Sequence, residues 1–171
     1  MKRTSLLGFS TIVAVSLSCG GAGIDGRGPQ VYQDAKEIVR EAKQGITEIS
    51  ADELREKIEN EEMFMLIDVR EPDEYFENMI DGAFNVPRGI LEFKMGDERY
   101  WDEQGMYVPE KTEELIIYSH RGNRGTLATE TLITLGYENV KNLQGGWMVW
   151  EYGPDALEEE EEAPSSGGCG G

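Results

Sequence analysis

The sequence predicts an α/β fold, with a central, mainly parallel sheet of five strands and helices on both of its faces. Strand-like segments alternate with helix-like segments along most of the chain, which is the order expected of parallel strands joined by crossover helices. The segment MFMLIDVR at 63–70 is a nearly continuous apolar run, as expected for a strand buried on both faces of a sheet. The chain has 171 residues, enough for one such domain with terminal extensions.

The first elements follow from helix signals and one alternating segment. Residues 32–44 carry apolar side chains at helical spacing and stop before a glycine, which predicts a short helix. The next segment, ITEIS, alternates like a short strand. Ser50 and Glu53 then have the spacing of a capping box, and Leu54 and Ile58 mark the expected buried stripe of a second helix.

The middle of the chain is regular at first and irregular afterwards. Residues 72–79 open with a proline and acidic residues, which favours a helix start, and GAFNVP at 82–87 indicates a short strand. Residues 88–114 show no sustained pattern, so we expect a short helix and a long surface excursion there. Tyr100 and Trp101 are the candidates for anchoring this excursion to the core.

The last elements again alternate between strand and helix. LIIY at 115–118 predicts a strand, 124–135 a helix, 139–146 a strand that runs into a Gly-Gly turn, and 147–153 a short final helix. The two tryptophans of the final helix are expected to cover the sheet edge. The expected core face of the longer helix consists of Leu127, Ala128, Thr131, Leu132 and Leu135.

The N-terminus has the pattern of an export signal. A short basic head precedes a 13-residue apolar-to-small run, which is too short to span a membrane. Cys19 follows directly and resembles the lipid-attachment cysteine of bacterial lipoproteins, although Ser16 stands where that family prefers leucine. The resemblance implies a lipid anchor on Cys19 and a location in the cell envelope, facing the periplasm or the exterior. Plain secretion and a retained anchor are the alternatives.

Charge and composition restrict the partners. The net charge is −18, from 34 acidic and 16 basic residues, which argues against nucleic acid because phosphate binding needs a positive surface. The tail contains five consecutive glutamates, at 158–162, and small residues, so we expect disorder there. Two distant cysteines, Cys19 and Cys169, and one histidine supply no metal-ligand cluster, and no cofactor is expected. These signals divide the chain into a signal peptide (1–18), a tether with a short helix (19–45), one domain (46–153) and a tail (154–171).

The stretch SHRGNRG at 119–125 is cationic within this acidic chain and lies between a predicted strand and a predicted helix. Its glycines, Gly122 and Gly125, permit tight turns, and amide groups at a helix start favour an anion. Arg121 and Arg124 add fork-shaped donors. We therefore predict an anion-binding loop built from His120, Arg121, Gly122, Asn123, Arg124 and Gly125. Ligands bind beyond the carboxyl ends of parallel strands, and Ser119 and Asp68 each stand at such an end.

Residues 46–153 resemble a single rhodanese-like (sulfurtransferase) domain. The matching pieces are LIDVREPDEY, GAFNVPRG, RGNRGTLATETLITLGY and NVKNLQGGWMVW, in the family's order. The resemblance implies the rhodanese-like fold and a sulfur-transfer loop that begins with a cysteine and has an arginine five positions later. The distance from Ser119 to Arg124 has that length, but serine stands at the cysteine position. Asn78 and Met79 also replace the family's frequent Gly-His.

The serine decides the function that the resemblance implies. A hydroxyl cannot carry a persulfide, so we expect no sulfurtransferase activity. We expect the loop to bind a small anion, such as a sulfur species, or a protein partner instead. One alternative is an active sulfur or persulfide transferase that uses Cys169 or a partner's thiol. Another is Ser119 as nucleophile with His120 as its base.

Individual side chains of the site receive expected roles. Asp68 is expected to support the loop or a neighbouring strand end through backbone amides, and Arg70 to form a surface pair with Glu74. Arg124 should organise the start of the helix, while Arg121 is the better candidate to contact a ligand.

Overall fold

The computed structural model of the protein describes residues 31–157. The predictions for the signal peptide, for Cys19, for residues 19–30 of the tether and for the tail from residue 158, including Cys169, lie outside the described residues.

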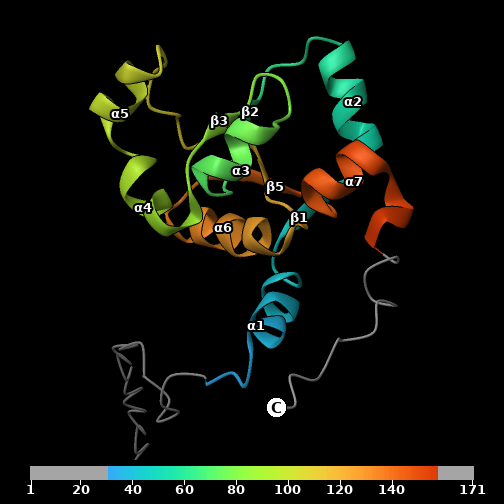
Figure 1. Ribbon diagram of the computed structural model, residues 1–171. Coiled ribbons are helices and arrows are strands. Elements are labelled where there is room, and N and C mark those ends of the chain that lie inside the picture. Colours follow the sequence, from blue (N-terminus) through green and yellow to red (C-terminus); the bar gives the residue numbers. More distant parts are fainter. Residues whose placement is uncertain (1–30, 158–171) are drawn as a thin grey trace, which may run out of the picture. The chain divides into compact units, whose positions relative to one another are not determined.

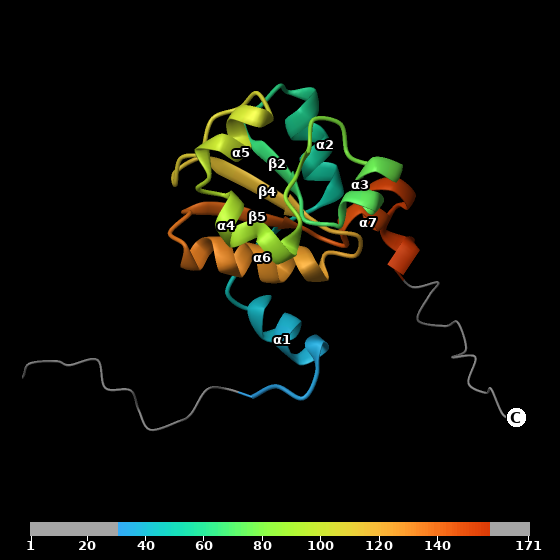
Figure 2. The ribbon, with the colours of Figure 1, turned by 60° about the vertical axis from the view of Figure 1, so that its left-hand side comes forward.

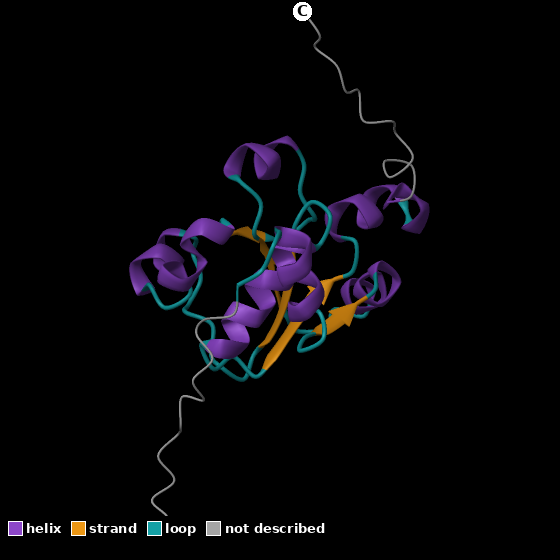
Figure 3. Cartoon of the chain, turned by 90° about the horizontal axis from the view of Figure 1, so that it is seen from below, coloured by secondary structure: helices purple, strands orange, loops and turns teal. Residues whose placement is uncertain are grey.

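A five-stranded, entirely parallel sheet forms the centre of the described chain, in the order β1-β5-β4-β2-β3. This confirms the predicted α/β class. The sheet was expected to be mainly parallel, and all of its strand pairs are parallel. Figure 1 and Figure 3 show the strands side by side with helices around them. The strands are β1 (Thr47–Ile49), β2 (Met65–Asp68), β3 (Phe84–Asn85), β4 (Glu114–Tyr118) and β5 (Asn139–Leu143).

Helices connect the strands as the sequence pattern indicates. The Ser50 hydroxyl accepts a hydrogen bond of 3.2 Å from the Glu53 amide, and the Glu53 carboxylate accepts one of 2.9 Å from the Ser50 amide. The predicted capping box at the start of α2 is therefore confirmed. Pro72 lies in the first turn of α3, where its missing N–H costs nothing. The helices are α1 (Ala35–Ala42), α2 (Ala51–Glu59), α3 (Pro72–Glu77), α4 (Leu91–Lys94), α5 (Glu98–Glu103), α6 (Asn123–Thr134) and α7 (Gly146–Tyr152), with 3₁₀ turns η1 (Arg88–Ile90) and η2 (Pro154–Leu157).

The sheet is buried on both faces because successive side chains point to opposite sides. In β4, Leu115 and Ile117 pack into one core, and Ile116 and Tyr118 into the other. The first core is covered by α4, α5 and α6, and the second by α2, α3 and α7 (Figure 2). This double burial explains why the central strands are apolar at every position.

The irregular region 88–114 is anchored by its aromatic residues, as predicted. Trp101 on α5 is fully buried and packs edge-on against Phe84, with ring centroids 5.8 Å apart. The hydroxyl of Tyr100 donates a hydrogen bond to the carbonyl of Asn85 on the edge strand β3. The excursion therefore covers the edge of the sheet and contains η1, α4 and α5, more regular structure than expected.

Two expected core positions are wrong, and the domain extends further than expected. Ile58 is 42% exposed and Leu135 is 41% exposed, because each lies near a helix end beyond the packed sheet. Thr126 and Thr129 are buried on α6 instead. The chain also continues past residue 153 into η2, which packs against α7. No described helix has the length and the apolar character needed to cross a membrane.

Candidate functional site

The strand order creates a topological switch point between the carboxyl ends of β2 and β4. The chain leaves β2 towards β3 on one side and leaves β4 towards β5 on the other, so the connections diverge at this point. Asp68 at the end of β2 is in register with Tyr118 at the end of β4, and Ser119 follows immediately. Open α/β sheets bind ligands at such a switch point. The residues 119–125, called the Ser119 loop below, occupy it.

A buried ion pair lies at the end of β2, beside this switch point. Arg70 donates to both carboxylate oxygens of Asp68, from Nε at 2.9 Å and from Nη2 at 2.7 Å, and neither side chain is more than 1% exposed. The Arg70 amide also donates to Asp68 at 2.9 Å. Asp68 thus supports Arg70 and not the amides of the Ser119 loop. The expected surface pair of Arg70 with Glu74 is wrong, because the cation of Arg70 points inward.

The remaining donors of Arg70 connect it to the surrounding elements. Nη1 donates to the side chain of Asn78 at 3.1 Å, and Nη2 to its carbonyl at 2.6 Å. The guanidinium carbon also lies 5.5 Å from the ring centroids of both Tyr118 and Trp147. Burial opposes the charge of Arg70, but the hydrogen bonds and charge of Asp68 raise the pKa of Arg70, so its guanidinium stays charged.

Ser119 lies at the base of its loop and is 1% exposed. Its Oγ accepts a hydrogen bond of 3.1 Å from the amide of Gly125, in the first turn of α6. His120 makes no hydrogen bond to this hydroxyl in the described structure. Its ring stacks on Trp147, with centroids 6.0 Å apart and planes 15° apart. The serine-nucleophile alternative therefore lacks both a base in contact and an accessible oxygen.

The carbonyl groups of the Ser119 loop point towards α7. The Trp147 amide donates to the Ser119 carbonyl at 2.8 Å, and the Met148 amide donates to the His120 carbonyl at 3.0 Å. The loop thereby satisfies amides of the first turn of α7 that have no partner within the helix. Gly146 makes this approach possible, since its φ is +62° and a Cβ there would overlap the Ser119 carbonyl.

Two glycines of the loop are required for the same reason of space. Gly122 has a φ of +83°, and a Cβ on it would lie 3.3 Å from the amide nitrogen of Gly145. At Gly125, a Cβ would overlap the side-chain oxygen of Asn142 on β5. The predicted tight turn is confirmed at Gly122, whereas Gly125 lies within α6 without a positive φ and is required for space alone.

Arg124 is held by an acid that sequence reasoning did not assign to it. Its Nη1 and Nη2 each donate to one oxygen of Glu74 on α3, both at 2.6 Å. This bidentate bond to Arg124 lowers the pKa of Glu74 to about 2, although partial burial works in the opposite direction. Arg124 thus fixes the start of α6 to α3, which fits the organising role expected of it.

His120, Arg121 and Asn123 complete the loop. His120 and Arg121 are half-buried, and Asn123 is exposed at the first position of α6. Burial is the main cause that lowers the pKa of His120; Arg70, Arg121 and Arg124 act in the same direction, and Glu74 opposes them. The imidazole is therefore neutral at pH 7, and a charge that binds at the Ser119 loop would change its pKa.

Comparison with known proteins identifies the family. The model of the rhodanese-like domain matches residues 50–152, more than half of the chain. The chain belongs to the rhodanese-like domain family.

Several relatives of this rhodanese-like domain carry the name sulfurtransferase. It is 36% identical over 106 residues to a putative sulfurtransferase of Bacillus subtilis, YtwF, covering 62% of this chain and 91% of that protein. It is 38% identical over 88 residues to a putative mitochondrial thiosulfate sulfurtransferase of Schizosaccharomyces pombe, covering 50% of this chain and 62% of the relative. The solved human single-domain sulfurtransferase TSTD1 has the same fold, with a TM-score of 0.57, 29% identity, and coverage of 60% of this chain and 93% of that chain.

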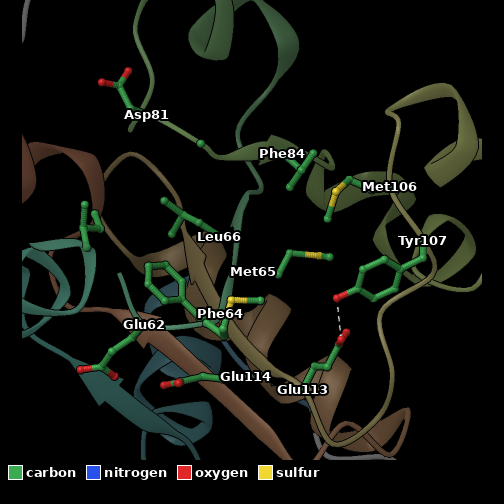
Figure 4. Close-up of a pocket in the computed structure, with 13 residues that line it drawn as sticks. Glu62, Phe64, Met65, Leu66, Asp81, Phe84, Met106, Tyr107, Glu113 and Glu114 are labelled. Atoms are coloured by element: carbon green, nitrogen blue, oxygen red, sulfur yellow. Dashed lines mark hydrogen bonds between the residues drawn. The ribbon is translucent and has the colours of Figure 1, made fainter. Parts of the chain in front are cut away.

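A separate hollow of about 440 Å³ lies at the opposite edge of the rhodanese-like domain, where β2 and β4 begin (Figure 4). Tyr107 points towards Glu113 there and donates a hydrogen bond of 2.7 Å to its carboxylate. Most of the lining is apolar, including Phe64, Met65, Leu66, Phe84 and Met106. No residue of the Ser119 loop lines this hollow, and its acids have no basic or nucleophilic partner in the lining. Within residues 31–157, His, Cys, Asp and Glu form no group of three or more that could hold a metal ion.

The structure therefore brings the predicted residues of the loop together and adds others to them. Arg70, Glu74, Asn78 and Asn142 were not assigned to the site from the sequence. Arg70 and Glu74 lie within the segment LIDVREPDEY that carries the family resemblance, so that segment was the available signal.

The Glu74–Arg124 pair predicts a pH-dependent stability. The pKa of Glu74 is about 2 in the folded protein, against an ordinary value of 4.5, so the unfolded chain takes up the proton at higher pH. The stabilisation is present above pH 4.5 and is lost as the pH falls towards 2. Glu74→Gln should lower the free energy of unfolding by about 1 kcal/mol at pH 7, a value reduced for partial exposure. Urea unfolding at pH 7 and pH 3 measures the difference.

The matched control is Glu103→Gln, which breaks the exposed Arg99–Glu103 pair on α5. We expect it to change stability little at either pH. A loss for Glu74→Gln that is the same at pH 7 and pH 3 would contradict the assignment.

Proposed function

We propose that this rhodanese-like protein is exported, tethered to a membrane through Cys19, and without sulfurtransferase activity, and that its Ser119 loop binds a small anion or a protein partner. One observation carries the proposal. By the resemblance of the loop to that of the family, Ser119 takes the position of the sulfur-carrying cysteine, and its hydroxyl is buried against the Gly125 amide.

The chemistry of sulfur transfer explains why this position decides the activity. A thiolate attacks the outer sulfur of thiosulfate, a new S–S bond forms, and the S–S bond of thiosulfate breaks as sulfite leaves with the electron pair. An acceptor such as cyanide then attacks the outer sulfur of the persulfide, and the thiolate leaves. Serine is un-ionised at neutral pH, and oxygen is neither the nucleophile nor the leaving group that these steps require.

The binding role is supported by what remains around Ser119. The loop retains the start of α6, which favours negative charge, together with His120, Arg121 and Arg124. The Nη groups of Arg124 are both bound to Glu74, so Arg124 positions the loop and Arg121 is the candidate to contact the anion. Divalent sulfur oxyanions such as thiosulfate are the probe that the family chemistry suggests.

Substitution of Ser119 tests the loss of activity. We expect no thiocyanate formation from thiosulfate and cyanide with the wild-type protein. Ser119→Cys should form it at least about 100-fold above that background, because enzymes typically accelerate reactions by far more than this. Ser119→Ala is the matched control and should stay inactive. Wild-type turnover that persists in Cys169→Ala would contradict the proposal, whereas turnover lost in Cys169→Ala would favour transfer through that thiol.

Anion binding can be measured at His120, the only histidine of the chain. Thiosulfate bound at the Ser119 loop should raise the pKa of His120, because a nearby negative charge stabilises the imidazolium. An NMR titration of the imidazole, with chloride at equal ionic strength as reference, gives both the pKa and the affinity. Arg121→Gln should weaken binding about tenfold through loss of a charge-assisted hydrogen bond. Arg99→Gln removes an exposed charge on α5 and should leave the affinity unchanged. Equal effects of the two substitutions would contradict binding at the loop.

The membrane tether is tested by the mature N-terminus. The proposal expects the processed protein to begin at a lipid-modified Cys19, detectable by mass spectrometry of the membrane fraction. Cys19→Ser should release the protein from the membrane or block its processing. A mature chain that begins elsewhere and carries no lipid would favour the secreted alternative.

A further inference from the structure

The hollow at the starts of β2 and β4 is large enough for a small ligand. Its volume of about 440 Å³ lies within the range of small-molecule sites. Its floor joins both hydrophobic cores, because Met65 and Phe84 pack in one core, and Phe64 and Leu66 in the other. Figure 4 shows Phe64, Met65 and Met106 around the same space. A ligand in the hollow would therefore continue the cores of the domain.

Apolar side chains at the rim of the hollow are left in solvent. Met63 is 89% exposed, Tyr107 is 54% exposed and Ile58 is 42% exposed, and all three line the hollow. Ile58 belongs to the apolar stripe of α2 that the sequence predicted to be buried. Exposed apolar side chains that gather at one place on a soluble domain mark a binding site more often than scattered ones do. One ligand in the hollow would cover all three.

The charged groups of the lining are all acidic. Glu62, Asp81, Glu113 and Glu114 line the hollow, and the lining contains no lysine, arginine or histidine. Lys57, which lies outside the lining, binds Glu62 at 2.6 Å and Glu114 at 3.1 Å. Within residues 31–157, no basic side chain forms an ion pair with Asp81 or Glu113. The hollow therefore has an uncompensated negative charge.

Glu113 places part of this charge beside an aromatic ring. Its Oε1 accepts a hydrogen bond of 2.7 Å from the Tyr107 hydroxyl, and its Oε2 accepts one of 2.9 Å from the Glu110 amide. Figure 4 shows Tyr107 and Glu113 directed towards each other at one side of the hollow. Both donors are uncharged, and a carboxylate oxygen can accept more than one hydrogen bond. Glu113 is thus held in place and can still accept a bond from a cation.

The uncharged part of the lining also suits a cation. Phe64, Phe84 and Tyr107 supply aromatic rings, whose faces attract ammonium groups. Three methionines add polarisable thioethers that adapt to the shape of a ligand. An anion would be repelled by the carboxylates. A neutral apolar ligand would remove water from the Glu113 carboxylate without offering it a partner, which is unfavourable.

We propose that this hollow binds a small organic cation, an alkylammonium group on an apolar or aromatic body. The ammonium group lies at Glu113 and Tyr107, and the body packs against Phe64, Met65 and Met106. The net charge of −18 attracts such a cation from a distance and favours its capture. No residue of the Ser119 loop lines the hollow, so the inference does not rest on the proposed anion-binding function.

Methionine methyl groups report directly on this site. The full chain, labelled with carbon-13 at the methionine methyls and kept in a nonionic detergent, is titrated with phenethylamine, a cation at pH 7. We expect the methyl resonances of Met63, Met65 and Met106 to shift with one common dissociation constant. Met95 and Met148 do not line the hollow, and their resonances should stay unchanged. The neutral analogue 2-phenylethanol should bind at least about tenfold more weakly, and the anion 3-phenylpropionate should cause no shift.

Substitutions separate the charge from the apolar contact. Glu113→Gln keeps an acceptor for the Tyr107 hydroxyl and should weaken phenethylamine binding at least about tenfold, with 2-phenylethanol unaffected. The matched control, Glu130→Gln, removes an exposed charge on α6 outside the lining and should change neither affinity. Met63→Gln alters an exposed side chain that folding does not require, and should weaken both probes by a similar factor of about three because apolar contact is lost.

Three results would overturn the inference. The first is equal affinity for phenethylamine and 2-phenylethanol, which would describe an apolar hollow that does not select cations. The second is equal weakening by Glu113→Gln and Glu130→Gln, which would be an effect of net charge alone. The third is the absence of shifts at the three methionines. Phenethylamine should leave the His120 resonances unchanged, so the thiosulfate titration decides anion binding at the Ser119 loop independently.

Discussion

The buried ion pair between Asp68 and Arg70 is the interaction on which the site depends. Burying two charges costs several kcal/mol per ion unless their hydrogen bonds are made, and here Arg70 donates to both oxygens of Asp68 and twice to Asn78. Its guanidinium also lies near Tyr118 and Trp147. The pair therefore joins the ends of β2 and β4, the segment after α3, and α7. Because Trp147 binds the Ser119 carbonyl and stacks on His120, the position of the loop follows from the position of this pair.

The elements and the loop could be predicted from the sequence because their signals are local. A capping box spans four residues, an apolar strand about five, and the Ser119 loop is a continuous stretch between a strand and a helix. The partners across the site could not be predicted in this way. Glu74 and Arg124 are 50 residues apart, and Arg70 was expected at the surface because nothing local shows that Trp147 and Tyr118 cover it. Ile58 and Leu135 were expected in the core for the same reason, since periodicity gives the face of a helix but not where the packed sheet ends.

The geometry of the loop does not require sulfur at its first position. The carbonyls of Ser119 and His120 accept hydrogen bonds from α7, and Arg124 is bound by Glu74. The two glycines of the loop pack closely against Gly145 and Asn142. The hydroxyl of Ser119 accepts a hydrogen bond from the Gly125 amide, as any other hydrogen-bond acceptor at that position could. Under the proposed replacement of the family cysteine, the chain loses a nucleophile and keeps the contacts that shape the loop. The presence of the rhodanese-like fold is therefore no argument that the chain retains sulfur transfer.

The charge of the whole chain and the charge of the loop act on a free anion in opposite directions. A net charge of −18 repels a free anion at distances up to the Debye length, roughly 8 Å at physiological ionic strength, and the loop attracts it only at short range. A free anion must overcome this repulsion and lose its translational freedom on binding. An anion that binds the Ser119 loop must therefore gain more from its short-range hydrogen bonds than it loses to both of these costs.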